Sequence, residues 1–202
     1  MDTFRDIVVI GGSEGSLVPL REILSGLPAN FPAAVLIVVH TGPSSPRLLA
    51  SIFDSWSALP VEYGGDGMSV ETGRVYLAPP GRHMEIVEPG VLHLSDGPKI
   101  MFSKPAVDRL FHTAAAVFGE RVVSLILSGN DGDGAFGAAS VRAAGGLSLV
   151  QDPGDALVSS MPVQAIEKDH PDSLVRSDAL LHALIHSVTQ PALQKLSSDR
   201  SG

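Results

Sequence analysis

Residues that together support acyl transfer follow the ends of three predicted strands. Ser13 comes shortly after a β-branched run, in a Gly-x-Ser-x-Gly pattern typical of the turn that exposes a nucleophilic serine. His40 directly follows six apolar residues, and Asp131 and Asp133 follow a third apolar strand. A serine nucleophile, a histidine base and an acid that orients the histidine transfer acyl groups in many hydrolases. Because parallel strands end at one edge of a sheet, these side chains are predicted to share a crevice.

Each of these signals has a second interpretation when it is taken alone. A glycine-rich turn after a first strand also binds phosphate or a nucleotide, although this turn contains neither G-x-G-x-x-G nor G-K-[ST]. His40 could cap its strand, and Asp131 or Asp133 could cap the next helix. An α/β-hydrolase fold is disfavoured, since its nucleophile follows several strands and its triad runs Ser, acid, His. A nucleotide-binding Rossmann-like domain therefore remains as a distant alternative.

Alternating buried strands and amphipathic helices predict an α/β fold with a doubly wound, mainly parallel sheet and helices on both faces. The stretch 61–94 contains short strand-like pieces between Gly/Pro turns, which predicts an inserted β-hairpin region. After the strand at 147–150 the sequence predicts a loop that lasts until the final helix. The expected strands are 7–10, 34–39, 121–127 and 147–150, and the expected helices are 17–24, a turn and N-cap at 43–46 leading to a helix through about 56, 105–118, 135–144 and 178–188.

The composition excludes several classes of site and partner. The chain has 202 residues, a formal net charge of −8 and no cysteine. The length favours a single domain, and the absence of cysteine excludes disulfides, thiolate nucleophiles and cysteine-ligated metals. The seven histidines are not spaced as a zinc site, so no metal is expected. The acidic balance argues against nucleic-acid binding. No apolar run is long enough for membrane insertion, and the first residues do not form a signal peptide.

Six motifs occur in an order that is specific to one family. On them, the chain resembles the catalytic domain of the CheB-type chemotaxis receptor methylesterases over about residues 5–190. The motifs are IGGSEGS at 10–16, VVH at 38–40, VYLAPPGRHMEI at 75–86, KPAVDRLFHTAA at 104–115, LILSGNDGDGAFG at 125–137, and QDP at 151–153 followed by Ala156 and MPVQAI at 161–166.

The resemblance implies a role for individual residues. It makes Ser13 the nucleophile, His40 the general base and Asp133, rather than Asp131, the acid of the triad. Asp133 is chosen because it directly precedes the Gly-Ala pair at the family's aspartate position. The oxyanion and substrate pocket is implied to include Gly12, Glu14, Asn130 and Met161.

The resemblance also implies an activity and a setting. Family members hydrolyse γ-glutamyl methyl esters on the cytoplasmic helices of chemoreceptors, and some deamidate receptor glutamines. No metal and no organic cofactor is implied. The expected partners are methylated chemoreceptor cytoplasmic helices, with a separate receiver domain or kinase as a further candidate. We expect a cytoplasmic CheB-type methylesterase domain over residues 1–196, without a receiver domain, and a disordered tail at 197–202.

Three departures from the family pattern surround the predicted pocket, while the triad positions are kept. Glu14 stands where the family usually has threonine, Thr41-Gly42 where it has Met-Pro, and Asn130 where it has methionine. A carboxylate beside the nucleophile would repel a developing oxyanion if it pointed inward. An alternative hypothesis is therefore a CheB-like binding or regulatory module with weakened catalysis and an altered substrate.

Overall fold

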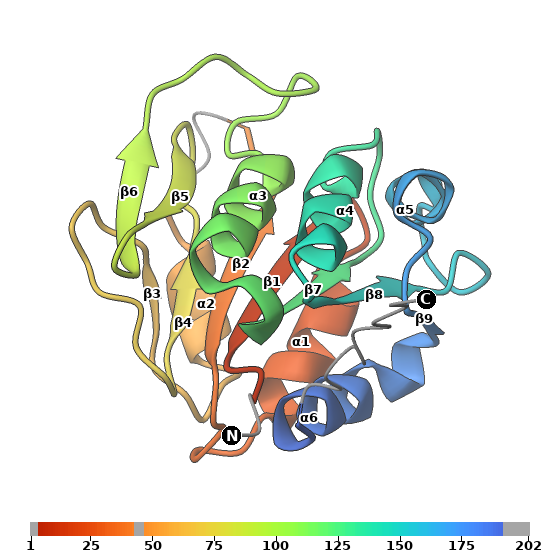
Figure 1. The fold of residues 1–202 in the computed structure, drawn as a ribbon, viewed down its shortest axis with the longest axis horizontal. Helices are drawn as coiled ribbons and strands as arrows, with labels where there is room; N and C mark the ends of the chain where they lie inside the picture. The colour runs from red at the N-terminus through yellow and green to blue at the C-terminus, as the bar shows by residue number, and fades with distance from the viewer. Residues whose placement is uncertain (1–3, 43–46, 192–202) are drawn as a thin grey trace, which may run out of the picture.

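The computed structural model describes residues 4–42 and 47–191 (Figure 1). Its centre is a seven-stranded sheet whose neighbouring strands are all parallel. β1 and β2 are buried at all six positions, because helices cover both faces of the sheet. In spatial order the strands are β3 (Val61–Tyr63), β4 (Val75–Leu77), β2 (Ala34–Val39), β1 (Ile7–Gly12), β7 (Val122–Ile126), β8 (Leu147–Gln151) and β9 (Ser173–Val175).

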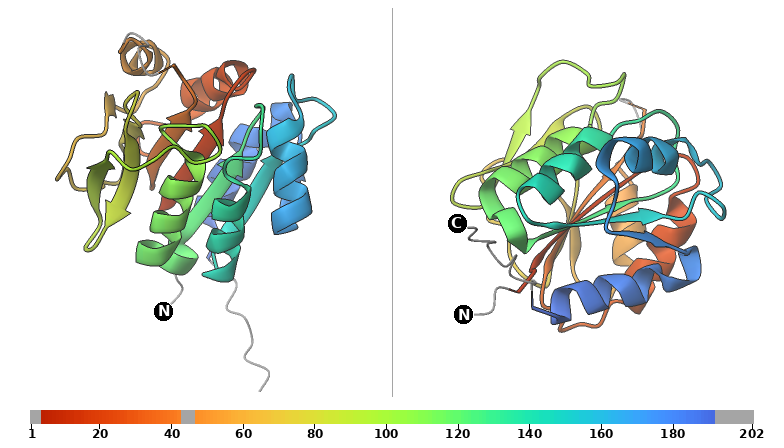
Figure 2. Two further views of the ribbon diagram at one scale, coloured as in Figure 1. Left: turned by 90° about the horizontal axis from the view of Figure 1, so that it is seen from above. Right: turned by 45° about the vertical axis from the view of Figure 1, so that its right-hand side comes forward.

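Two layers of helices enclose the sheet (Figure 2). Each helix buries an apolar face against one of two hydrophobic clusters, which lie on opposite sides of the strands. One layer consists of α1 (Leu17–Gly26), α2 (Leu49–Asp54) and α6 (Leu180–Thr189), and the other of α3 (Val107–Phe118), α4 (Ala135–Ala143) and α5 (Ser160–Asp169). The doubly wound α/β fold predicted from the sequence is therefore confirmed.

The order of the strands changes direction between β1 and β7. From β1 the chain moves outward on one side through β2, and it later returns to β7, which pairs with the other side of β1. Ligands in open α/β sheets bind beyond the carboxyl ends of the strands at such a switch point. The loops that follow β1 and β7 flank this point.

The prediction of hairpins throughout residues 61–94 was only partly right. β3 and β4 join the main sheet as parallel strands, whereas β5 (His83–Val87) and β6 (Val91–Ser95) form the antiparallel hairpin. This hairpin packs its apolar face on α3. Because β3 and β4 have three residues each, their sequences are too short for a distinctive parallel-strand pattern.

The loop predicted between β8 and the last helix was wrong. The chain forms α5 and β9 in that stretch. α5 buries few side chains and β9 is largely exposed, so neither carries a strong hydrophobic period. The predicted N-cap at 43–46 and the predicted tail at 197–202 lie outside the described residues. None of the described helices is both long and apolar enough to cross a membrane.

Candidate active site

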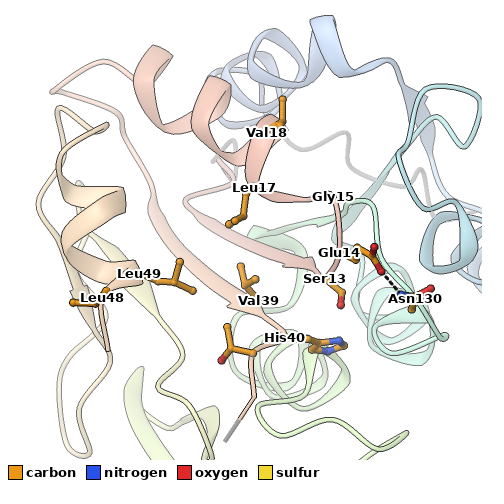
Figure 3. Close-up of a pocket in the computed structure, with 11 residues that line it drawn as sticks. Ser13, Glu14, Gly15, Leu17, Val18, Val39, His40, Leu48, Leu49 and Asn130 are labelled. Carbon is orange, nitrogen blue, oxygen red and sulfur yellow. Dashed lines mark hydrogen bonds between the residues drawn. The ribbon is translucent and has the colours of Figure 1, made fainter. Parts of the chain in front are cut away.

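The register of the sheet brings Ser13 and His40 to the same edge. Gly12, the last residue of β1, pairs with Val39, the last residue of β2. The next residues, Ser13 and His40, therefore leave the sheet side by side and line one cavity of about 710 Å³. Figure 3 shows the Ser13 hydroxyl pointing toward the imidazole of His40.

Ser13 is held in a tight turn between β1 and α1. Its backbone N–H donates to the carbonyl oxygen of Ser128 at 2.9 Å, in the loop after β7. The Ser16 hydroxyl donates to the Ser13 carbonyl oxygen at 2.7 Å. Gly15 has a φ of +85°, a conformation that side chains disfavour. These contacts fix the backbone and leave the Ser13 side chain facing the cavity.

His40 and Asp133 form a short hydrogen bond at the base of this cavity. The distance from His40 Nε2 to Asp133 Oδ2 is 2.7 Å, and the Asp133 side chain is fully buried. Asp131 instead accepts the backbone N–H of Asp133 at 3.0 Å and so shapes the loop. The structure thus pairs His40 with Asp133, where the residue types alone had left Asp131 open.

The second ring nitrogen of His40, Nδ1, is not bonded to Asp133. Because Nε2 is bonded to a carboxylate, that nitrogen carries the proton in the neutral ring and Nδ1 is the basic atom. The Ser103 hydroxyl lies 3.3 Å from Nδ1. Among the described residues no hydrogen bond joins Ser13 Oγ to His40, a separation that apo active sites often show before substrate binds.

The N-terminus of α3 holds the Asp133 carboxylate. The N–H of Val107 donates to Oδ2 at 2.7 Å, and the N–H of Asp108 donates to Oδ1 at 2.9 Å. The first N–H groups of a helix lack partners within the helix, so Asp133 satisfies two of them. The carboxylate is thereby oriented toward His40 from a rigid element.

Asp108, in the first turn of α3, in turn accepts hydrogen bonds from the loop and helix that follow Asp133. Its Oδ1 accepts the N–H groups of Gly134 at 3.0 Å and Gly137 at 2.7 Å, at the start of α4. Burial, with a further contribution from the Asp133 charge, raises the pKa of Asp108 from 3.8 to about 6, against the lowering effect of these N–H groups. Asp133, just before α4, thus caps the N-terminus of α3, and Asp108 of α3 caps the N-terminus of α4.

The raised pKa of Asp108 predicts that Asp108→Asn changes the free energy of unfolding in a pH-dependent way. The folded-state pKa lies above the unfolded value, so the folded chain binds more protons between about pH 4 and 6. The wild-type free energy of unfolding should therefore decrease as pH rises through this range, by about 3 kcal/mol at most. Asp108→Asn cannot titrate at this position, so it lacks this decrease. Denaturant unfolding from pH 4 to 8 measures it. The free energy of unfolding of the variant should increase relative to that of the wild type as pH rises from 4 to 6.

A difference between the two proteins that stayed constant from pH 4 to 8 would contradict this account of Asp108. The comparison needs a variant that also loses one carboxylate at neutral pH. Asp178→Asn is the matched control, because the Asp178 side chain is 73% exposed and pairs with Arg176 at the surface.

Glu14 and Asn130, two of the departures from the family pattern, are hydrogen-bonded to each other. The Asn130 side-chain amide donates to Glu14 Oε2 at 2.8 Å. Figure 3 shows the Glu14 side chain turned toward Asn130 and away from His40. The carboxylate therefore sits at the rim of the cavity. Within the described chain, the backbone N–H groups of Glu14 and Asn130 donate no hydrogen bond.

The opposite wall of the cavity is apolar and open to solvent. Figure 3 shows Leu17, at the start of α1, facing Leu49, at the start of α2, across the cavity, and Val18 and Leu48 also line it. Leu17, Val18 and Leu48 are all strongly exposed. The aliphatic part of a substrate side chain that packed against this wall would lie in the same cavity as Ser13.

Gly12 and Met161, also predicted pocket residues, lie behind the cavity rather than in its lining among the described residues. Met161 is buried and its N–H donates to the Gly129 carbonyl oxygen at 2.9 Å. A Cβ on Gly129 would lie 2.2 Å from Met161 Sδ and 2.7 Å from Ser13 Cβ. Gly129 therefore allows the Asn130 loop to approach the nucleophile.

Sequence reasoning missed two polar residues at the site. Ser103 carries no sequence signal, because its contact with His40 depends on the path of the loop between β6 and α3. Asp108 had a usable signal, since a carboxylate in the first turn of an amphipathic helix often caps N–H groups. In the part of the chain that is described, no three His, Asp or Glu side chains gather as a metal site.

Comparisons with known proteins identify the family of this chain. A solved relative, the CheB methylesterase catalytic domain of Thermotoga maritima, superposes with a TM-score of 0.85 and 34% identity, over 90% of this chain and 97% of that one. A protein-glutamate methylesterase/protein-glutamine glutaminase of Methanosarcina acetivorans is 37% identical over 191 residues, which are 91% of this chain and 54% of the relative.

A putative enzyme of the same name from Leptospira interrogans is 32% identical over 180 residues, covering 89% of this chain and 93% of the relative. The chain thus spans about half the length of the Methanosarcina relative and nearly all of the Leptospira relative. The family model for CheB methylesterase matches residues 8–184. The chain therefore belongs to the CheB methylesterase family.

Proposed function

We propose that this chain is a serine hydrolase that removes methyl esters from glutamyl side chains of chemoreceptors. The observation that carries the proposal is the 2.7 Å bond between His40 and the buried Asp133, beside a Ser13 hydroxyl that faces an open cavity. Membership of the family supports the substrate class. The chemistry is acyl transfer by a nucleophile, a base and an orienting acid.

In the proposed first step, Ser13 Oγ attacks the ester carbonyl carbon while His40 Nδ1 takes the hydroxyl proton. The resulting imidazolium is stabilised by the Asp133 carboxylate at Nε2. Collapse of the tetrahedral intermediate breaks the bond to the methoxy oxygen, which takes the proton from His40 and leaves as methanol. Water activated by His40 then cleaves the acyl-enzyme and yields the glutamate.

The negative charge that develops on the carbonyl oxygen needs donors beside Ser13. We assign this role to the backbone N–H groups of Glu14 and Asn130, which donate no hydrogen bond to the described residues. The bond between their side chains keeps the Glu14 carboxylate at the rim. Gly12 and Met161 act in this proposal by fixing the backbone around the nucleophile.

The proposed substrate also sets the partner and the location. The scissile side chain would belong to the cytoplasmic helices of methylated chemoreceptors, so the protein would act in the cytoplasm as one domain over residues 1–196. A separate receiver domain or kinase is proposed as a regulator. We propose no metal or organic cofactor, since the steps above use only side chains and water.

The test is methanol release from a receptor cytoplasmic fragment that carries γ-glutamyl methyl esters. The proposal expects release in proportion to enzyme, and a parallel ammonia assay with the glutamine form tests deamidation. If the wild-type chain released neither product, the proposed activity would be wrong. Release of ammonia alone would be consistent with the proposed triad but would show that the methyl ester is not the substrate.

A further inference from the structure

The loop between β6 and α3 contains a two-residue turn with an unusual conformation. Ile100 and Ser103 exchange backbone hydrogen bonds of 3.1 and 2.8 Å, so Met101 and Phe102 are the central residues of a tight hairpin. Both have positive φ, 44° and 67°. This is the type I′ pattern, in which asparagine and glycine are strongly preferred. Two bulky residues in that conformation are strained.

Packing against the described residues does not account for Phe102. Phe102 is 93% exposed and Met101 is 41% exposed. An exposed aromatic ring on a strained turn costs conformational energy and buries little apolar area. Strained residues that gain nothing from packing are often maintained by function.

The turn is fixed to the catalytic residues on two sides. The residue after it, Ser103, contacts His40 Nδ1 at 3.3 Å. On the other side, the Met101 methyl carbon lies 3.4 Å from the position that a Cβ would take on Gly132, in the loop that carries Asp133. The turn therefore lies close to both loops of the site, and Phe102 is exposed on it.

Phe102 also lines a cavity of about 280 Å³ that adjoins the catalytic one. The two cavities share His40 and Thr41. Lys99 and Lys104 line the second cavity as well, which makes this side of the site basic in a chain of net charge −8. A polypeptide that delivers a side chain to Ser13 would pass over this surface.

We infer that the Met101-Phe102 turn is a substrate-docking element, in which Phe102 contacts an apolar side chain of the polypeptide that carries the scissile ester. Lys99 and Lys104 favour a segment with carboxylates near that apolar residue. The inference rests on the proposed hydrolase function and adds to it how a protein substrate is distinguished from a small ester. Apolar contact with a phenyl ring is strong enough to change affinity about tenfold.

The test is the double variant Met101→Asn/Phe102→Gly, which installs the residues that this turn prefers. We compare kcat/KM for a methylated receptor fragment with kcat/KM for p-nitrophenyl acetate, which is too small to reach Phe102. The ratio of the two should fall about tenfold, mainly through KM for the receptor fragment. The Tm should rise by roughly 5 °C, because the strain is relieved.

The matched control is Leu174→Ala, which removes an exposed apolar side chain at the far edge of the sheet on β9. Its ratio should equal that of the wild type. An unchanged ratio in the double variant, with both substrates hydrolysed, would overturn the docking role and leave the proposed function standing. A lower Tm would contradict the strain argument. Failure of the wild type on both substrates would overturn the function and the inference together.

Discussion

Ser13→Ala should reduce kcat for ester hydrolysis by about 10⁵–10⁶, the largest effect expected from any single change in this chain. Without the hydroxyl no acyl-enzyme forms, and the absence of cysteine leaves no stronger nucleophile nearby. The oxyanion donors remain, so a small residual rate above the uncatalysed reaction is expected. Methanol release from a methylated receptor fragment measures the loss.

The fold of this variant should be unaffected, because Ser13 is held through its backbone atoms. Ser140→Ala is the matched control, since it removes a surface hydroxyl that bonds to a carbonyl oxygen within α4 and to His112. Its activity should equal that of the wild type. Undiminished methanol release by Ser13→Ala would exclude Ser13 as the nucleophile.

Asp133→Asn should lower kcat by about 10³–10⁴. If the new amide group faces His40, Nε2 becomes the acceptor and the proton moves to Nδ1, which then cannot take the proton of Ser13. If the amide nitrogen instead takes the Oδ1 position, it opposes the N–H group of Asp108, while the oxygen at the Oδ2 position can still accept from Val107 and His40. Either orientation loses a buried hydrogen bond, so the free energy of unfolding should fall by about 1–3 kcal/mol.

Single-turnover kinetics and denaturant unfolding on the same preparation separate the two effects. The catalytic loss should persist at temperatures where the variant is fully folded. Asp131→Asn is the matched control in the same loop, because Asp131 bonds to a backbone N–H rather than to His40. A loss of less than tenfold in Asp133→Asn would contradict the role of Asp133 in orienting the base.

The convergence of Ser13 and His40 could be predicted because it follows from simple sheet geometry. Two continuous apolar runs predicted neighbouring parallel strands, and the residue after each run then had to emerge at one edge. The residues of the 127–134 loop belonged to the same edge once β7 was recognised as a third buried strand. The choice of Asp133 over Asp131 could not be made this way, because both lie in one short loop.

The remaining errors have a common physical cause. β3, β4 and β9 have three residues each, so the sheet recruits them through hydrogen bonds to neighbours rather than through their own pattern. α5 was missed because its burial is limited to a few side chains. The contact of Ser103 with His40 spans 63 positions in sequence and depends on the course of an irregular loop.

The structure also shows how the Glu14 carboxylate is placed relative to the nucleophile. A carboxylate beside the nucleophile suggested weakened catalysis, but its hydrogen bond to Asn130 ties two departures from the family pattern into one feature. The paired change keeps the charge at the rim of the cavity, where it can influence which substrates approach. Glu14 and Asn130 are therefore better viewed together than as two independent losses.

Covalent labelling shows whether His40 and Asp133 activate Ser13. The chain is treated with a fluorophosphonate, and the adduct is located by peptide mass spectrometry. We expect one adduct, on Ser13, that forms much more slowly in His40→Gln. An unlabelled wild-type chain, as a binding module without catalysis would give, or an adduct on another residue, would contradict it.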